Sequence, residues 1–289
     1  MYISFDMDKA IAAREILLLG AFDEARAVAA KAGIEIIPLK GAALLELGIY
    51  KVGERGMSDA DVLVRPKDLE RFEKILHGLH YQPMPNSADA WVRPSPNNAP
   101  PAILDLHTGL WHIKHTEELF NWGLEPGPGG IALNLADLFL HAAAHPLLHH
   151  GEVKPRNLED CTRIALSAPG DGEKFWAAVA RKAGVYGLRS VIWPVIKRLS
   201  AGPLAIPEAE LKALKPRGLE KIKAAFFEKA AAKHSTPLEY LLPVLHRPGF
   251  LLKYAVPEKH FMLRRYGAAS LALYLLRPLR LVYSAFRRR

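Results

Sequence analysis

The stretch RGMSDADVLVRPKD, Arg55 to Asp68, places two carboxylates on alternate positions of a strand-like run of small and apolar residues. Asp is disfavoured inside strands. Side chains two residues apart on a strand point to the same face. Asp59 and Asp61 would therefore lie close together and repel each other. The pattern predicts a cation between them, unless water covers both.

The residues around this stretch predict alternating helices and strands. A helix is expected over Lys9–Ala32, rich in Ala, Leu, Glu and Arg and closed by Gly33. Pro66 opens a helix whose apolar residues recur at helical spacing up to Leu79. The other expected elements are a short helix opened by the turn KGAALLELG (40–48) and strands IEIIPL (34–39), DADVLV (59–64), YQPM (81–84), AWVRP (90–94) and AILDLHTGLW (102–111).

The tract PGPGG, residues 126–130, is a strong break. From Leu133 onward the sequence predicts helices with almost no strand signal, and Pro194 is expected to kink one of them. We therefore predict an α+β N-terminal domain over residues 1–132, with a mixed sheet flanked by helices, and an all-helical domain over residues 133–289.

Composition limits the class of protein. The chain has 289 residues and a net charge of +9, which favours anionic partners without choosing among them. Cys161 is the only cysteine, so a disulfide framework and a cysteine-based zinc site are excluded and a reducing, cytoplasmic setting is expected. The sequence predicts neither a signal peptide nor an integral membrane segment.

A third carboxylate is available on another predicted strand. Asp105 lies in the motif LDLH, with His107 two residues further on the same face. Carboxylates gathered in this way bind Mg²⁺ or Mn²⁺, which take oxygen ligands. Upstream, Gly41 lets an anion approach the start of a helix closely, and Lys40 adds a positive charge there.

These motifs resemble an uncharacterised nucleotidyltransferase family of the DNA polymerase β superfamily. The resemblance is densest over Pro38–Asp68 and Ile103–Leu110, and it continues through LHAAAH (140–145) into a helical tail. It implies a polymerase β-type nucleotidyltransferase domain followed by helices. It also implies that Asp59 and Asp61 are the first two metal ligands and Asp105 the third.

The resemblance implies a reaction as well. A nucleotidyl group would pass from an NTP, with ATP as the expected substrate, to a hydroxyl acceptor, with release of pyrophosphate. Lys40, Gly41, Arg55 and Ser58 would contact the phosphates. Ala42 departs from the family pattern, because the superfamily has a serine hydroxyl at the corresponding position. The acceptor stays open among a small molecule, a peptide or protein, and RNA, with RNA the least favoured.

Two other functions compete with this hypothesis. The first is a catalytically weak or inactive nucleotide-binding or interaction protein, which Ala42 favours and the three acids oppose. The second is a nucleic-acid-binding protein, suggested by the charge. It is opposed by basic residues that are scattered and gathered at the C-terminal end, without interleaved aromatics on a sheet or groove.

Two further features invite functional hypotheses. His141, His145 and His149 are four residues apart on one helical face, and we interpret them as a domain-interface feature rather than a zinc site, because Pro146 interrupts the helix. The segment SLALYLLRPLRLVYSAFRRR (270–289) is both apolar and basic, as in helices that lie on anionic lipid. Pro278 is expected to break such a face, so a docking helix with solvated arginines is the favoured interpretation here.

Overall fold

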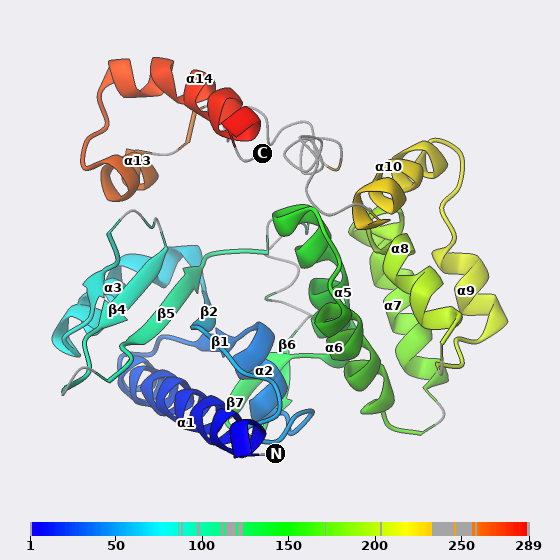
Figure 1. Ribbon diagram of the computed structural model, residues 1–289, viewed down its shortest axis with the longest axis horizontal. Helices are drawn as coiled ribbons and strands as arrows, with labels where there is room; N and C mark the ends of the chain where they lie inside the picture. Colours follow the sequence, from blue (N-terminus) through cyan, green and yellow to red (C-terminus); the bar gives the residue numbers. More distant parts are fainter. Residues whose placement is uncertain are drawn as a thin grey trace. The chain divides into compact units, whose positions relative to one another are not determined.

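The computed structural model describes residues 2–85, 87, 89–96, 99–110, 113, 120, 124–170, 172–202, 204–232, 246, 256–257 and 259–287. The chain forms two compact units (Figure 1). The first contains residues 1–110 and 116–134, and the second contains residues 111–115 and 135–289. No helix in the described part of the chain is long and apolar enough to cross a membrane.

The first unit is built on a five-stranded mixed sheet in the order β1-β2-β5-β4-β3. The central pair β2 and β5 is parallel, and the other neighbours are antiparallel. The strands are β1 (Ile36–Pro38), β2 (Ala60–Val64), β3 (Gln82–Pro83), β4 (Ala90–Arg93) and β5 (Ala102–His107). The predicted mixed sheet is therefore confirmed, although β5 ends at His107, earlier than expected; Trp111 lies outside the described residues.

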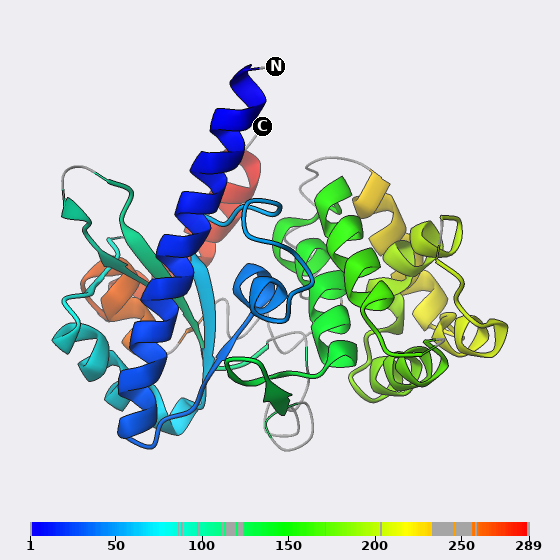
Figure 2. The same ribbon diagram turned by 90° about the horizontal axis from the view of Figure 1, so that it is seen from below.

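Two helices cover one face of this sheet. The 30-residue helix α1 (Tyr2–Lys31) runs across the strands (Figure 2), and α3 (Leu69–Gly78) follows the short 3-10 turn Pro66–Asp68. Phe22 of α1 and Phe72 of α3 share one buried core cluster with alternate residues of the strands, among them Val62 and Leu104. Because side chains alternate along a strand, Asp61 and Asp105 must point to the opposite face.

A third, shorter helix and a hairpin complete the first unit. Helix α2 (Lys40–Glu46) follows β1, and Gly48 with φ of 69° comes soon after its end. The break expected at PGPGG is the turn of an antiparallel hairpin between β6 (Leu124–Gly127) and β7 (Gly130–Leu133), two short strands that the sequence did not predict. Gly130 has φ of 141°, so the tract that predicted a break supplies the backbone freedom for the turn.

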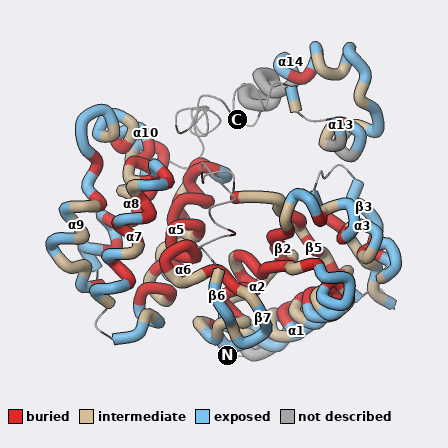
Figure 3. The backbone as a smooth tube through the Cα atoms, turned by 180° about the vertical axis from the view of Figure 1, so that it is seen from behind, coloured by how far each residue is buried: buried red, intermediate tan, exposed pale blue. Residues whose placement is uncertain are grey.

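As predicted, the regular elements in the described part of the second unit are all helices. Its helices are α5 (Leu135–His145), α6 (Pro155–Leu166), α7 (Glu173–Val185), α8 (Arg189–Ser200), α9 (Glu208–Leu214), α10 (Glu220–Ala232), α13 (Lys259–Tyr266) and α14 (Leu271–Arg287). Helix α5 is buried along nearly its whole length (Figure 3). After His145 the chain continues as a π-helical turn, Pro146–His150, so Pro146 ends the α-helix as expected.

The interior of this helical unit contains a buried ion pair, an aromatic contact and the cysteine. Asp137 of α5 is fully buried and accepts hydrogen bonds from Lys182 and Tyr186 of α7. Phe139 packs edge-on against Trp176, with ring centroids 5.2 Å apart, in the same layer. Cys161 is fully buried, and burial raises the pKa of its thiol, which fits the expected small core residue.

Candidate functional site

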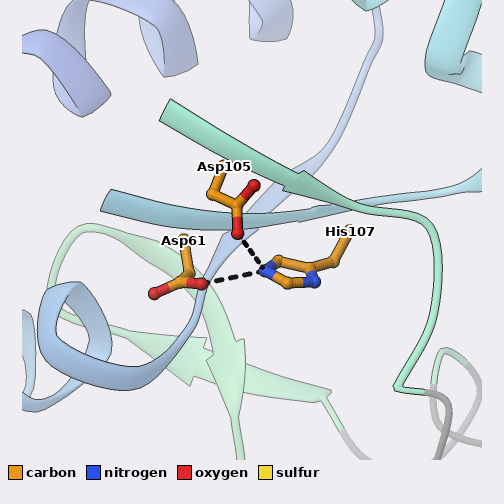
Figure 4. Close-up of side chains that lie close together, drawn as sticks. All are labelled: Asp61, Asp105 and His107. Carbon is orange, nitrogen blue, oxygen red and sulfur yellow. Dashed lines mark hydrogen bonds and ion pairs between the residues drawn. The ribbon is translucent and has the colours of Figure 1, made fainter. Parts of the chain in front are cut away.

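The parallel pairing of β2 and β5 brings Asp61 and Asp105 side by side. The two residues are direct partners in the register, and Leu63 pairs with His107 two positions further. Asp105 and His107 are two apart on β5, so both project from the face on which Asp61 lies. The strands thus bring two of the three predicted carboxylates together with a histidine (Figure 4).

The side chains of Asp61, Asp105 and His107 form a compact group, which we call the Asp61 group. Their ligand atoms all lie within 4.8 Å of one another. The Nε2 atom of His107 lies 2.8 Å from Oδ1 of Asp61 and 3.4 Å from Oδ2 of Asp105, so the ring nitrogen faces both carboxylates (Figure 4). Two carboxylates and an imidazole are donors that a divalent metal can take. Within the described residues this is the one group of acids, histidines or cysteines with such an arrangement.

Lys40 is the second cation at Asp61. Its Nζ atom lies 2.5 Å from Oδ1 of Asp61, the same oxygen that His107 contacts. The backbone N–H of Leu39 also donates to the carbonyl of Asp61, at 3.0 Å. Lys40 has φ of 47°, an unusual value for a residue other than glycine, where the chain turns from β1 into α2. Such local strain concentrates at functional sites.

The contacts around Asp61 set the charges of the group. Burial on its own would raise the pKa of Asp61, but the hydrogen bond from His107 and the charge of Lys40 outweigh it and lower the pKa. For His107, burial would lower the pKa, but hydrogen bonds to Asp105 and Asp61 outweigh it and raise the pKa to about 9. At neutral pH the carboxylate of Asp61 is therefore ionised and the ring of His107 is protonated.

Asp59 lies just before β2 and outside the compact group. Its Oδ1 atom accepts a hydrogen bond of 2.8 Å from the hydroxyl of Ser58. Burial raises the pKa of Asp59, the charges of Asp61 and Asp105 raise it further, and Ser58 and Lys40 oppose the shift. The charges of Asp61 and Asp105 therefore act on the pKa of Asp59, although Asp59 is not a member of the compact group. Its role as a metal ligand stays a prediction.

Gly41 makes room for two side chains at the start of α2. A Cβ atom on Gly41 would lie 2.3 Å from Nη1 of Arg55 and 2.6 Å from Sδ of Met57. Any larger residue would displace Arg55 or Met57, so glycine is needed for this close packing. Ala42 is buried in the core cluster of the first unit. The roles expected for Gly41, Ala42 and Arg55 at the phosphates stay predictions.

Arg14 and Glu15 of α1 bind the segment that leads into β2. The sequence predicted no role for either residue. Glu15 is fully buried, and its carboxylate accepts hydrogen bonds of 2.5 Å from the backbone N–H groups of Gly53 and Gly56. Arg14 donates to the carbonyls of Ser58 and Pro101, next to β2 and β5. The one available signal was an acid and a base beside the apolar run ILLLGAF (16–22).

The hydrogen bonds of Glu15 to the loop before β2 are expected to stabilise the fold measurably. Glu15→Ala should lower the free energy of unfolding by about 2 kcal/mol, because two amide donors lose a buried charged acceptor. The change is measured by urea denaturation of the full chain. Glu24→Ala on the same helix is the matched control, since Glu24 pairs with Arg93 at an exposed position and should cost less than about 0.5 kcal/mol. Equal effects of both variants would contradict the anchoring role.

The comparison with protein families fits this geometry. The family described as "Uncharacterised nucleotidyltransferase" matches residues 6–200. The chain belongs to this family. No curated protein and no solved structure gave a significant match. The match to the nucleotidyltransferase family includes the whole Asp61 group and helices α5 to α8, whereas α9 to α14 lie beyond it.

The described histidines of α5 and the turn after it do not form an equivalent metal group. His141, His145 and His149 follow one another, with ring centroids 5.3 Å and 4.9 Å apart, and the rings of His145 and His149 are stacked. The nitrogen atoms do not meet as the ligand atoms of the Asp61 group do. Among the described residues of this family member, the acidic group on the sheet is therefore the candidate metal centre.

Proposed function

We propose that the protein is a metal-dependent nucleotidyltransferase that moves a nucleotidyl group from an NTP, preferably ATP, to a hydroxyl acceptor. The observation that carries this proposal is the meeting of Asp61, Asp105 and His107 on the face of the sheet not covered by α1 and α3. Membership of a nucleotidyltransferase family gives the reaction class. The setting expected is cytoplasmic, with Mg²⁺ or Mn²⁺ as the cofactor.

The donor atoms fit such a cofactor. Asp61 and Asp105 offer carboxylate oxygens, and Asp59 lies near enough for its pKa to respond to both. Mg²⁺ and Mn²⁺ are bound by oxygen ligands of this kind. Asp59, Asp61 and Asp105 would hold the metal. When bound, a divalent cation offsets charge on the phosphates and lowers the pKa of an acceptor hydroxyl.

The protein's own residues supply the remaining functions. Lys40, already at the group, is assigned to the triphosphate, with Arg55 and Ser58 as further contacts on its oxygens. Asp105 has a more exposed side chain than Asp61, at 25% against 7%, and is assigned to the acceptor side. The acceptor hydroxyl loses its proton to water and its oxygen forms a bond to the α-phosphorus. The bond from the α-phosphorus to the oxygen that bridges it to the β-phosphate breaks, and pyrophosphate leaves.

His107 is assigned a positioning role. Its hydrogen bonds join the two carboxylates and fix the orientation of both. A histidine that contacts two acids in this way resembles the supporting partners that orient metal ligands in other proteins. A direct ligand role for the imidazole would favour Mn²⁺ over Mg²⁺. The metal dependence of turnover therefore bears on this assignment.

The test is a screen of the purified full chain with each of the four labelled NTPs and with Mg²⁺ or Mn²⁺. We expect pyrophosphate release that depends on the metal and is abolished by EDTA, together with transfer of label to an acceptor from a cell extract. Acceptors to be separated in the assay are small molecules, peptides or proteins, and RNA. Release that persists in EDTA would overturn the metal-dependent mechanism.

A second function is favoured by one observation. Lys40 and His107 both contact Oδ1 of Asp61, so two cations of the protein already neutralise this carboxylate. Together with Ala42 at the phosphate-binding position, this fits a nucleotide-binding or interaction protein with little or no turnover. The same screen separates the two functions, because NTP binding that needs no metal, without pyrophosphate release, would identify the inactive form.

A further inference from the structure

Helix α14 exposes a row of leucines. Leu271, Leu275 and Leu279 are four residues apart, so they lie on one side of the helix. Their exposed fractions are 75%, 68% and 66%, and Leu276 beside them is 46% exposed. Figure 3 shows much of the described part of α14 in the colour of exposed residues. We call these four residues the leucine face.

The opposite side of α14 packs on α13 through an arginine. Arg277 is two residues from Leu275 and Leu279, roughly half a turn around the helix. It is only 6% exposed, it donates a hydrogen bond of 2.7 Å to the hydroxyl of Tyr266, and it lies 4.7 Å above the ring of Phe261. Arg277 is thus turned inward and the leucines outward.

The helix is also continuous across Pro278, which was expected to break such a face. Pro278 lies inside α14, which extends from Leu271 to Arg287. The missing amide of Pro278 removes one backbone hydrogen bond but leaves the helix in place. The leucine face therefore continues past Pro278 to Leu279.

The charge of this segment is all of one sign. Residues 259–289 contain no Asp or Glu. They contain seven arginines and one lysine: Lys259, Arg264, Arg265, Arg277, Arg280, Arg287, Arg288 and Arg289. Basic residues near a membrane surface are attracted to anionic lipid headgroups. The segment therefore combines exposed apolar side chains with a purely positive charge.

We propose that α14 binds the surface of an anionic phospholipid bilayer, with the leucine face among the acyl chains and the basic residues other than Arg277 at the headgroups. Amphipathic helices of this composition lie in the interface without spanning the bilayer. Nucleic acid fits less well, because the large exposed side chains are leucines, which neither stack on bases nor bind phosphates. This inference is independent of the proposed reaction.

The test is flotation of the full chain with vesicles. One set contains phosphatidylcholine alone, and the other contains about 30% phosphatidylserine as an anionic lipid. We expect the protein to float with the anionic vesicles and not with the neutral ones, and binding should weaken as salt is raised. Leu275→Ser with Leu279→Ser should lower the bound fraction at least about tenfold, because two apolar anchors are lost.

The control is Leu166→Ser on α6. Leu166 is 68% exposed, the same fraction as Leu275, but it lies outside the basic segment. This variant should bind anionic vesicles like the unchanged chain. The proposal is overturned if the chain fails to float with anionic vesicles, or if the double variant floats equally well. It is also overturned if the leucines instead support a dimer, seen by sedimentation, or binding of single-stranded RNA.

Discussion

Asp61→Asn is expected to lower the rate of metal-dependent pyrophosphate release by about 10³-fold or more. Asp61 is the residue on which Lys40, His107 and the paired Asp105 converge, and it is almost fully buried. Asparagine has nearly the same shape but no charge, so the packing is kept while the site loses its central anion. The measurement is the initial rate at saturating NTP, with the metal varied.

Asp23→Asn is the matched control for this substitution. Asp23 lies on α1 in the same unit, its side chain is 60% exposed, and it pairs with Arg26 one turn further along the helix. It should leave the rate within about twofold. Thermal melting of both variants separates loss of the site from loss of folding. Unchanged turnover by a folded Asp61→Asn protein would contradict the assignment of Asp61.

The strand pattern predicted most of the site for a physical reason. Alternation along β2 placed Asp61 away from the apolar face that α1 and α3 cover, and the motif LDLH placed Asp105 in the same way on β5. Two acids on the uncovered face of neighbouring strands lie side by side when the register of the strands pairs their positions. In the parallel register of β2 and β5, Asp61 and Asp105 are direct partners.

The partners of these acids could not be predicted in the same way. The contact of Lys40 with Asp61 depends on the positive φ at the start of α2, which no local pattern in the sequence requires. His107 lies near Asp105 by strand alternation, but its contact with Asp61 depends on the register of β2 and β5, in which His107 pairs with Leu63. Glu15 reaches Gly53 and Gly56 from a distant helix, and such long-range contacts have no sequence period.

The hairpin and the C-terminal helix show a different limit of sequence patterns. Proline and glycine in PGPGG predict a break, and these residues form the turn between β6 and β7, so the local preference holds while the two short strands beside it are not predicted. Pro278 predicts a break in the face of the C-terminal helix, but α14 continues through it, with Arg277 packed on α13. At Pro278 the helix therefore forms against the local preference of proline.

The buried pair Lys182–Asp137 gives the largest expected effect on stability. Their side chains are 4% and 0% exposed, and the hydroxyl of Tyr186 also donates to Asp137, at 2.9 Å. Lys182→Met should lower the free energy of unfolding by about 3–5 kcal/mol, because the carboxylate stays buried without its cation. That is a large part of the 5–15 kcal/mol typical of whole proteins. Guanidinium denaturation of the full chain measures the change.

Two further variants show whether the cost comes from the unpaired charge. Asp137→Leu combined with Lys182→Met removes both charges and should recover most of the loss, since an apolar pair of similar volume replaces a buried ion pair at little cost. Lys197→Met makes the same side-chain change at an exposed pair with Glu228, where the side chains are 56% and 36% exposed, and should cost less than about 1 kcal/mol. If Lys182→Met costs no more than Lys197→Met, the pair does not stabilise the helical unit. If the double variant is as unstable as the single one, the loss comes from packing around α5 and α7 and not from an isolated carboxylate.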